Sequence, residues 1–514
     1  MASESKPRLL YFNGPWDYLS ERLIASYIVP FRRLLDQDFE VISIEGDCDL
    51  SDEVEKYRPD AILFHTGTES NNEREVTITR ADSYREIPRM GYMYRDPISP
   101  SRIAPMNRMA KWGVDQIFTC NRQSDSPIPF FKDSLYVPWW VDDTVFRDYG
   151  EAKTYPITLA GAGWLSAQFF YTWRKPIFAQ LVLRFPIFHV PVFENHKSRD
   201  AFVGVNYARL LNQSLCAAGC GSVNRYLTLK LLEIPASRCC LITEETEVLK
   251  AIGFVDGVNC IFADEKNVLQ KVQAIFDDPT RLQKITDAGF ELVHRCHTQR
   301  QRRMFIEWFR LWKSRQPAQK IVQVHPLEPL QIIGHDSPTP ECRFPTESPV
   351  FEALHAGYRL IAESNWSEAY AKFKWVLGVI AYVAEARLGA GICALHSNDL
   401  QMASKHLTAN LDNQTELRIT RHPDVISIAY LAVVLVKMNA MKDAVDVLRR
   451  SLGFKHPALN SLCWLLAIRH KALKSRDPMF DVAEGDETTT IQTVHLLPAT
   501  GFHGWLECWK SLLG

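Results

Sequence analysis

Long hydrophobic runs and an excess of either charge are both missing from this chain. Its 514 residues carry 59 Lys and Arg against 60 Asp and Glu, for a formal net charge of −1. Nucleic-acid binding and contact with anionic membranes both rely on a basic surface, so this balance favours neither partner. The best apolar stretches, such as residues 426–436, are shorter than the ~20 residues that span a bilayer. We therefore expect no nucleic-acid partner and no transmembrane segment.

The first residues also lack the apolar core of a secretory signal peptide, so we expect a cytoplasmic protein. The twelve cysteines are then expected as small apolar core residues in a reducing compartment. Cys216 and Cys220 have the spacing of metal ligands, but no second His or Cys pair lies at zinc-site distance from them. Asp47 and Asp49 fall in a polar loop rather than at a strand end. No metal site is expected.

Short apolar runs alternate with amphipathic stretches over the first 315 residues. In residues 1–150 the runs lie at 9–12, 40–44, 61–65, 90–94, 116–119 and 135–140. In residues 151–315 they lie at 157–163, 188–192, 210–216, 240–242 and 258–262. Strands that alternate with helices form parallel sheets covered on both faces. The pattern therefore predicts two successive α/β domains.

Composition changes after residue 315. Seven prolines lie between residues 316 and 349, which predicts an extended linker or a surface strap over 316–348. Beyond it the chain is helical, and small and large residues recur with a period of 34: Gly357, Ala369 and Phe373, then Gly391, Ala403 and Leu407, then, after an insertion, Ala432, Ala444 and Leu448. Such positions let stacked helix pairs pack closely.

This period resembles the tetratricopeptide repeat, although the usual closing proline is absent. The resemblance implies stacked helix pairs over residues 349–475, and an unrelated helical bundle is the alternative. Residues 476–514 begin acidic and become aromatic, which suits a tail with a capping helix.

The most informative segment, residues 228–245, predicts a helix that leads into a short buried strand. Lys230 and Glu233 lie three residues apart on the helix, and Thr243 and Glu244 end the strand. A cation can face phosphates while a carboxylate accepts from ribose hydroxyls, so this edge of the sheet suits a sugar nucleotide. Alternatively, Lys230 and Glu233 lie on a solvated helix face. Thr243 and Glu244 could instead have an N-cap role.

Glycines after predicted strands are candidates for contact with a diphosphate through their backbone N–H groups. Gly161 and Gly163 follow the first strand of the second domain, and Gly14 follows the first strand of the chain. Arg174 supplies a second candidate cation. A bare Gly-x-Gly turn is equally common as a tight loop, and Arg174 could lie on a solvated helix face.

Four segments in order, 207–214, 226–236, 247–259 and 288–302, resemble those of the group 1 glycosyltransferases, particularly the variety typified by bacterial spore-maturation proteins. The resemblance covers roughly residues 157–310. It implies the GT-B fold, in which two Rossmann-like domains face a cleft, with a nucleotide sugar as co-substrate and no cofactor. It also implies that Glu233 accepts from ribose and that His297 is structural.

One departure from that family concerns the mechanism. Its retaining members carry two glutamates eight positions apart, and here Arg225 stands where the partner of Glu233 is expected. We therefore expect an inverting reaction, in which one general base deprotonates the acceptor. Asp17 in the loop after the first strand is favoured, and His65 and Asp96 at neighbouring strand ends are its competitors. Each could instead cap a helix or turn, or be a structural histidine.

These patterns together predict a nucleotide-sugar-dependent glycosyltransferase whose helical repeats recruit the acceptor. Stacked repeats offer concave surfaces to peptides and proteins, so a protein acceptor is favoured, such as a bacterial surface or flagellar protein. A polysaccharide or lipid-linked acceptor is second. The rivals are a transferase-fold scaffold without turnover and a nucleotide-sugar epimerase. A homo-oligomer is left open.

Overall fold

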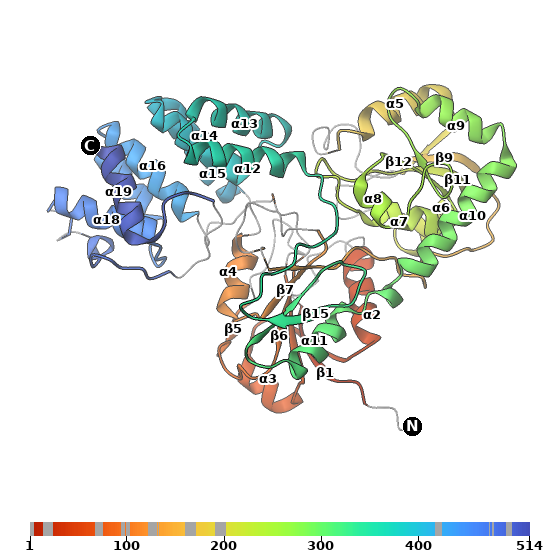
Figure 1. Ribbon diagram of the computed structural model, residues 1–514, viewed down its shortest axis with the longest axis horizontal. Helices are drawn as coiled ribbons and strands as arrows, with labels where there is room; N and C mark the ends of the chain where they lie inside the picture. The colour runs from red at the N-terminus through yellow and green to blue at the C-terminus, as the bar shows by residue number, and fades with distance from the viewer. Residues whose placement is uncertain are drawn as a thin grey trace.

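The structure is a computed structural model, and it describes residues 5–13, 24–66, 76–93, 98, 103–121, 131, 133–159, 171–190, 202–416, 424–471, 473–474, 477–489 and 496–514. Along the chain the described residues form two α/β units and then a region of helices alone (Figure 1). The first unit lies below in that view, with the second unit and the helical region above it on opposite sides. The predicted α/β class is confirmed.

The first unit is built on a six-stranded sheet of order β2-β1-β4-β6-β7-β8, in which every pair is parallel. Its strands are β1 (Arg8–Asn13), β2 (Glu40–Glu45), β4 (Ala61–Thr66), β6 (Arg89–Met93), β7 (Gln116–Thr119) and β8 (Leu135–Tyr136). Its helical segments are η1 (Ile24–Ile28), α2 (Val29–Asp36), α3 (Leu50–Tyr57) and α4 (Ile103–Lys111), and β3 (Cys48–Asp49) pairs with β5 (Ile78–Thr79). Strands β1 and β6 are buried on both faces, as expected for parallel strands under helices.

The second unit has a five-stranded parallel sheet of order β10-β9-β11-β12-β13. Its strands are β9 (Tyr155–Leu159), β10 (Ile187–His189), β11 (Ser214–Ala218), β12 (Cys240–Thr243) and β13 (Ile261–Phe262). Its helices are α5 (Arg174–Arg184), α6 (Val205–Asn212), α7 (Leu229–Ala236), α8 (Glu247–Ala251), α9 (Val268–Phe276) and α10 (Pro279–Cys296). Strand order reverses between β9 and β11, so ligands are expected at the carboxyl ends of these strands.

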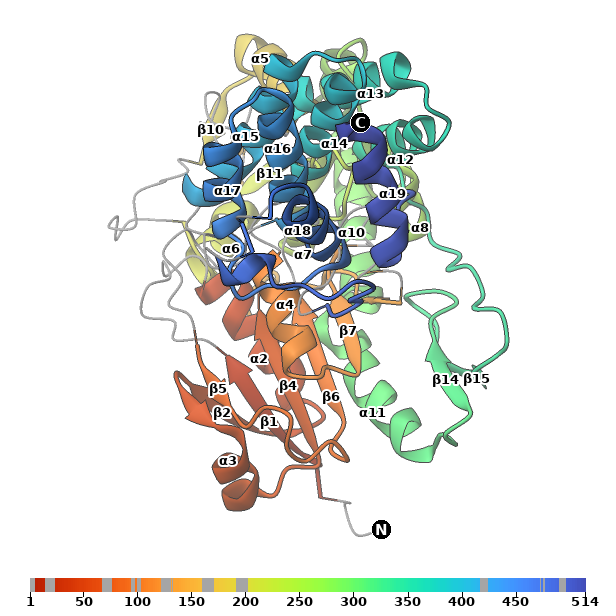
Figure 2. The same cartoon turned by 90° about the vertical axis from the view of Figure 1, so that its left-hand side faces the viewer.

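Helix α11 (Met304–Ser314) leaves the second unit and packs on the first sheet, as both views show (Figures 1 and 2). The Phe305 ring lies 4.6 Å from Phe118 and 5.6 Å from Phe31, measured between centroids. Just before it, Arg302 donates to the carbonyl oxygens of Pro138 and Trp139. The sequence boundary at residue 315 thus falls after a helix that belongs to the first unit by packing, because amphipathic spacing does not say which sheet a helix covers.

The Pro-rich segment 316–348 is a folded strap on the first unit. It contains a hairpin of two antiparallel strands, β14 (Gln319–Val322) and β15 (Gln331–Gly334). The Gln323 side chain accepts from the backbone N–H of Tyr136 and donates to its carbonyl, both at 2.9 Å. This pair of bonds copies a strand pairing and fixes the strap to β8. Of the two forms that the sequence left open, the strap is therefore the one observed.

The helical region comprises α12 (Pro349–Ala362), α13 (Trp366–Val379), α14 (Ala384–His396), α15 (Leu400–Glu416), α16 (Val425–Lys437), α17 (Met441–Arg449), α18 (Pro457–Arg469) and α19 (Gly501–Leu513). The small-to-large contacts inferred from the period are present. A Cβ atom on Gly357 would lie 2.6 Å from the Phe373 ring, and one on Gly391 would lie 2.7 Å from Leu407. Helix α19, in the expected tail, packs on α16 and α18. Consecutive helices therefore pair closely, while membership of the tetratricopeptide class stays a prediction.

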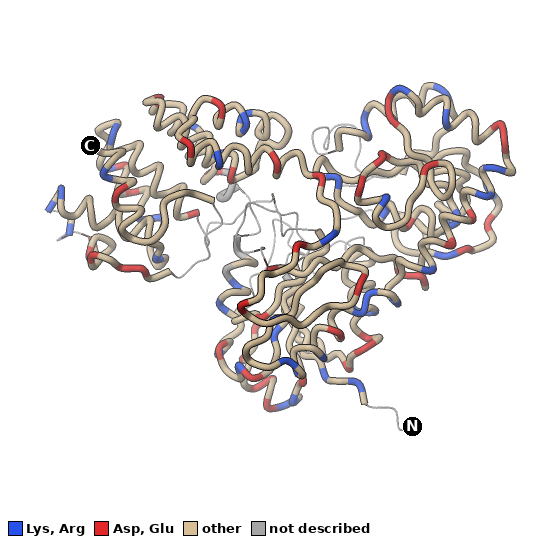
Figure 3. The backbone as a smooth tube through the Cα atoms, in the orientation of Figure 1, with Lys and Arg blue, Asp and Glu red and all other residues tan. Residues whose placement is uncertain are grey.

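Both signs of charge occur in every part of the described chain. Lys and Arg are interspersed with Asp and Glu in both α/β units and in the helical region (Figure 3). None of the helices that the structure describes combines the length and apolar character needed to cross a bilayer.

Candidate functional site

The candidate site lies at the carboxyl edge of the second sheet, where β11 and β12 end side by side. Ala218 at the end of β11 pairs with Ile242 in β12. A loop of residues 219–228, which we call the donor loop, leads from β11 to α7, and Glu244 follows β12 directly. This edge is next to the reversal of strand order between β9 and β11, which is the usual ligand position in open parallel sheets.

Helix α7 brings Lys230 and Glu233 to this edge on neighbouring positions of one face. Glu233 is buried, with 8% of its surface exposed. The stem of Lys230 lies over the start of the donor loop, because a Cβ atom on Gly219 would be 3.4 Å from Lys230 Cγ. The loop ends at Thr228, whose hydroxyl donates to the Cys220 carbonyl oxygen at 3.2 Å. Lys230 and Glu233 therefore both belong to the helix that follows the donor loop.

Arg174 is the first residue of α5 and is buried, with its guanidinium 3.9 Å from the centroid of the Tyr171 ring. The charges of Arg174 and Lys230 both act on the thiol of Cys220 in the donor loop. Burial raises the pKa of that thiol to about 11, and the charges of both cations oppose the increase. Two positive charges from different helices thus act on the start of the loop that follows β11.

Glu244 adds a carboxylate that titrates near neutrality. Its Oε1 accepts from the backbone N–H of Gly221 at 3.1 Å. Burial raises the pKa of Glu244 to about 7, against the charges of Arg225 and Arg174 and the Gly221 hydrogen bond, while Glu347 adds to the increase. At neutral pH this carboxyl group is therefore partly protonated and partly ionised. Thr243 is fully buried one residue earlier, and its hydroxyl meets no hydrogen-bond partner in the described parts of the chain.

His65 is the only predicted candidate of the first unit that falls within the described residues, and it lies on β4 in an aromatic cluster. Its Nδ1 is 2.6 Å from the Tyr11 hydroxyl, and its ring centroid is 4.8 Å from that of Phe31 and 5.2 Å from that of Tyr92. Burial lowers the pKa of His65 to about 3, so the imidazole is neutral at pH 7. A group with so low a pKa accepts a proton poorly at neutral pH.

Five of the predicted candidates lie outside the described residues: Asp17, Asp96, Gly14, Gly161 and Gly163. His297 is buried, with Nε2 2.8 Å from the Ile252 carbonyl oxygen and Nδ1 3.1 Å from an Arg302 nitrogen. It thus links α10 to the segment that returns to the first unit.

The sequence analysis did not identify two charged residues of the site, Arg225 and Glu347. It noted Arg225 only as the replacement of a family glutamate. Arg225 lies in the donor loop with a left-handed φ of 52°, and its Nη1 is 3.7 Å from Glu347 Oε1. The replacement of a family glutamate was the only signal for Arg225. Glu347 lies in the strap, far from the donor loop in sequence, and local pattern contains no information about so distant a pairing.

Residues 146–307 match the family described as glycosyl transferase-like. This stretch contains β9 to β13 and every described candidate residue of the second unit. Residues 146–307 make up about a third of the chain, so the match describes the second unit and not the whole protein. No curated protein sequence matches the chain.

The chain is similar to several solved structures at low identity. Sucrose-phosphate synthase from Thermosynechococcus elongatus is 9% identical, with a TM-score of 0.42, over 60% of this chain and 100% of its own. A glycosyltransferase from Rickettsia africae ESF-5 is 12% identical, with a TM-score of 0.38, over 61% of this chain and 100% of its own. HepE of Anabaena, in complex with UDP and glucose, is 9% identical, with a TM-score of 0.37, over 58% of this chain and 98% of its own. Likenesses at this level do not say what this chain binds.

Proposed function

We propose that the protein is a glycosyltransferase that moves a sugar from a nucleotide-sugar donor to an acceptor, with the donor bound at the carboxyl edge of the second sheet. The observation that carries the proposal is the pair of cations Arg174 and Lys230, whose charges both act on Cys220 just after β11, within the glycosyl transferase-like stretch. Two cations at the point where strand order reverses suit a diphosphate.

Each candidate of the second unit then has a role toward the donor. Arg174 and Lys230 neutralise the diphosphate, Glu233 accepts from a ribose hydroxyl, and the turn with Gly161 and Gly163 offers backbone N–H groups. Thr243 and Glu244 end β12 and are assigned to the nucleotide or the sugar, and Gly14 to the donor from the first unit. Side-chain cations and backbone dipoles can stabilise a leaving diphosphate, so we propose a reaction that uses neither a metal nor a further cofactor.

The proposed reaction is inverting, with one general base in the first unit. The family's earlier glutamate is replaced by Arg225, which pairs with Glu347 and has no carboxylate to offer. Asp17 remains the favoured base, followed by Asp96. His65 is the weakest of the three because its neutral, buried imidazole has a pKa of about 3.

We further propose that the acceptor is a protein, such as a bacterial surface or flagellar protein, and that the helical region recruits it in the cytoplasm. Stacked helix pairs are common peptide-binding surfaces. Helix α14 has eleven of its thirteen residues buried, so it offers few exposed positions for recruitment. Trp375 on α13, which is 47% exposed, is the best anchor there, because tryptophan is enriched at binding hot spots.

The direct test is calorimetric titration of the full-length protein with a panel of UDP-, GDP-, ADP- and dTDP-sugars, followed by an assay for transfer. We expect one donor class to bind and to be consumed when an acceptor extract is added. If donors bind and none is consumed with any acceptor, the protein is a scaffold that uses its helical region. If none binds, the site is wrongly assigned.

A further inference from the structure

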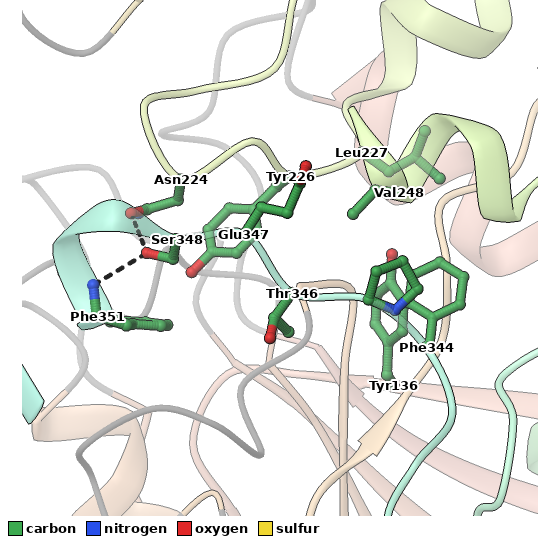
Figure 4. A pocket seen from close by; sticks show the side chains of 11 residues that line it. Tyr136, Asn224, Tyr226, Leu227, Val248, Phe344, Thr346, Glu347, Ser348 and Phe351 are labelled. Atoms are coloured by element: carbon green, nitrogen blue, oxygen red, sulfur yellow. Dashed lines mark hydrogen bonds between the residues drawn. The ribbon is translucent and has the colours of Figure 1, made fainter. Parts of the chain in front are cut away.

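The first helix of the helical region is fastened to the donor loop by its own N-cap residue. Ser348 Oγ accepts from the Phe351 backbone N–H at 3.1 Å and donates to Asn224 Oδ1 at 2.6 Å (Figure 4). Both Ser348 and Asn224 are buried. One hydroxyl therefore starts α12 and holds the middle of the donor loop.

The preceding residue, Glu347, reaches two loops of the second unit with one carboxylate. Its Oε1 lies 3.7 Å from Arg225 Nη1 in the donor loop, after β11. Its Oε2 accepts from the backbone N–H of Glu247 at 2.9 Å, at the start of α8 after β12. The carboxylate thus bridges the segments that follow two neighbouring strands at the candidate donor site.

The donor loop has a conformation that depends on such outside support. Arg225 has a φ of 52°, which is unfavourable for a residue with a Cβ atom and persists where surrounding contacts impose it. The backbone of the loop is also tightly packed against itself at Gly221, because a Cβ atom there would lie 2.7 Å from the Tyr226 carbonyl oxygen. Gly221 is also the residue that donates to Glu244. Contacts that hold Asn224 and Arg225 therefore also hold the loop that carries this N–H.

Apolar packing supports the same junction. Val223 of the donor loop belongs to the core of the helical region, together with Val350 and Phe351 of α12. Beside it a small pocket is lined by the donor loop, by the strap and by Tyr136 of the first unit (Figure 4). All three parts of the protein thus meet at the point where Glu347 contacts the second unit.

We propose that Glu347 is a positioning residue for the donor site, which holds the segments after β11 and β12 in place through Arg225 and the N–H of Glu247. The proposal rests on the proposed function, since it assigns this edge to a nucleotide diphosphate. Donor affinity is then linked to the attachment of the helical region. Glu347 itself does not touch the donor.

The charges around Glu244 give this link a pH signature. Glu244 faces the positive charges of Arg225 and Arg174 and the negative charge of Glu347. Removal of the Glu347 charge lowers the pKa of Glu244, so more of this carboxylate is ionised at pH 7. An ionised Glu244 repels a diphosphate bound beside Arg174 and Lys230. The variant therefore binds more weakly at neutral pH, and its loss of affinity with rising pH begins at a lower pH.

The test uses full-length protein and whichever of UDP, GDP, ADP and dTDP binds the wild type most tightly. We expect Glu347→Gln to raise the Kd at pH 7 by about 2- to 30-fold, the range typical of coupling residues. The midpoint of the fall in affinity between about pH 5.5 and pH 8.5 should move to lower pH. Ligand ionisation is the same for both proteins, so the difference between them isolates the protein's own groups. Ser348→Ala should weaken binding without moving the midpoint, because no charge is removed.

The matched control is Glu352→Gln, an exposed glutamate one turn further along α12, which should leave Kd and midpoint unchanged. If Glu347→Gln folds poorly, Arg225→Gln breaks the same pair from the loop side; it should also raise the Kd, but its midpoint should move to higher pH because the Arg225 charge lowers the pKa of Glu244. The double variant should lose no more affinity than the larger single loss. Wild-type Kd and midpoint in the folded Glu347→Gln or Arg225→Gln protein would overturn the positioning role alone. If none of the four nucleotides binds the wild type, the proposed function falls and this inference with it.

Discussion

The backbone N–H of Gly221 donates to Oε1 of Glu244 across 3.1 Å and so joins the loops that follow β11 and β12. Burial raises the pKa of that carboxyl to about 7. This titrating carboxyl also feels the charges of Arg225 and Arg174, at the edge of the sheet where a diphosphate is proposed to bind. Donor binding is therefore expected to depend on pH in the neutral range.

We expect donor affinity to fall as the pH rises through about 7. Below that pH Glu244 is protonated and neutral, and above it the carboxylate repels a bound diphosphate. Glu244→Gln is fixed in the neutral state, so its affinity should change little between about pH 6 and pH 8 apart from the ionisation of the ligand. Calorimetry across this range measures the difference. An identical pH profile in wild type and variant would exclude Glu244 as the titrating group.

Glu233→Ala should weaken donor binding by ~1–3 kcal/mol, the typical cost of a lost buried hydrogen bond. The melting temperature shows whether the variant is folded. Glu291→Ala on the exposed face of α10 is the control and should bind like the wild type. Unchanged donor affinity in a folded Glu233→Ala protein would remove the ribose assignment.

Asp17→Asn should leave donor affinity intact and reduce turnover by about 10²- to 10⁴-fold, the usual contribution of a general base. The comparison is between the Kd for the donor and kcat for transfer. Near-normal turnover would transfer the role to Asp96 or His65, and the same substitution strategy at those positions would then decide between them.

His65 should make the fold sensitive to acid. The unfolded histidine gains a proton below about pH 6.5, whereas the buried ring has a pKa of about 3 and stays neutral, so stability is lost as pH falls between these values. His65 should contribute about 2 kcal/mol to the loss between pH 7 and pH 5, so the loss should be smaller by that amount in His65→Gln. Urea unfolding at the two pH values measures it. His335→Gln, at an exposed histidine, should behave like the wild type.

Two glycine-to-alanine substitutions in the helical region should have opposite effects. A Cβ atom on Gly357 would lie 2.6 Å from the Phe373 ring, so Gly357→Ala should destabilise the region by about 1–3 kcal/mol. A Cβ atom on Gly378 in α13 would meet nothing within 4 Å, so Gly378→Ala should stabilise it by up to about 1 kcal/mol. Equal effects in thermal unfolding would contradict the helix packing described here.

Local patterns predicted the elements whose partners are near in sequence. The strands were found because their residues are consecutively apolar, and Lys230 and Glu233 share a face because helices repeat every 3.6 residues. The small residues at positions 357 and 391 indicated close helix pairs for the same reason.

Long-range relationships had no such signal. Helix α11 is amphipathic on either sheet, and its position on the first unit depends on Phe31 and Phe118, which are distant in sequence. Proline content indicated an extended linker or a strap over 316–348 but not the hairpin within it. The pairing of Glu347 with Arg225 depends on the tertiary arrangement of the strap and the second unit, which neither local segment encodes.

A structure of the protein with its nucleotide-sugar donor tests the central claim most directly. The account predicts the diphosphate between Arg174 and Lys230 at the carboxyl edge of the second sheet, with a ribose hydroxyl within hydrogen-bond distance of Glu233. A nucleotide bound at any other place on the protein, or a Glu233 carboxylate that points away from it, would contradict the account.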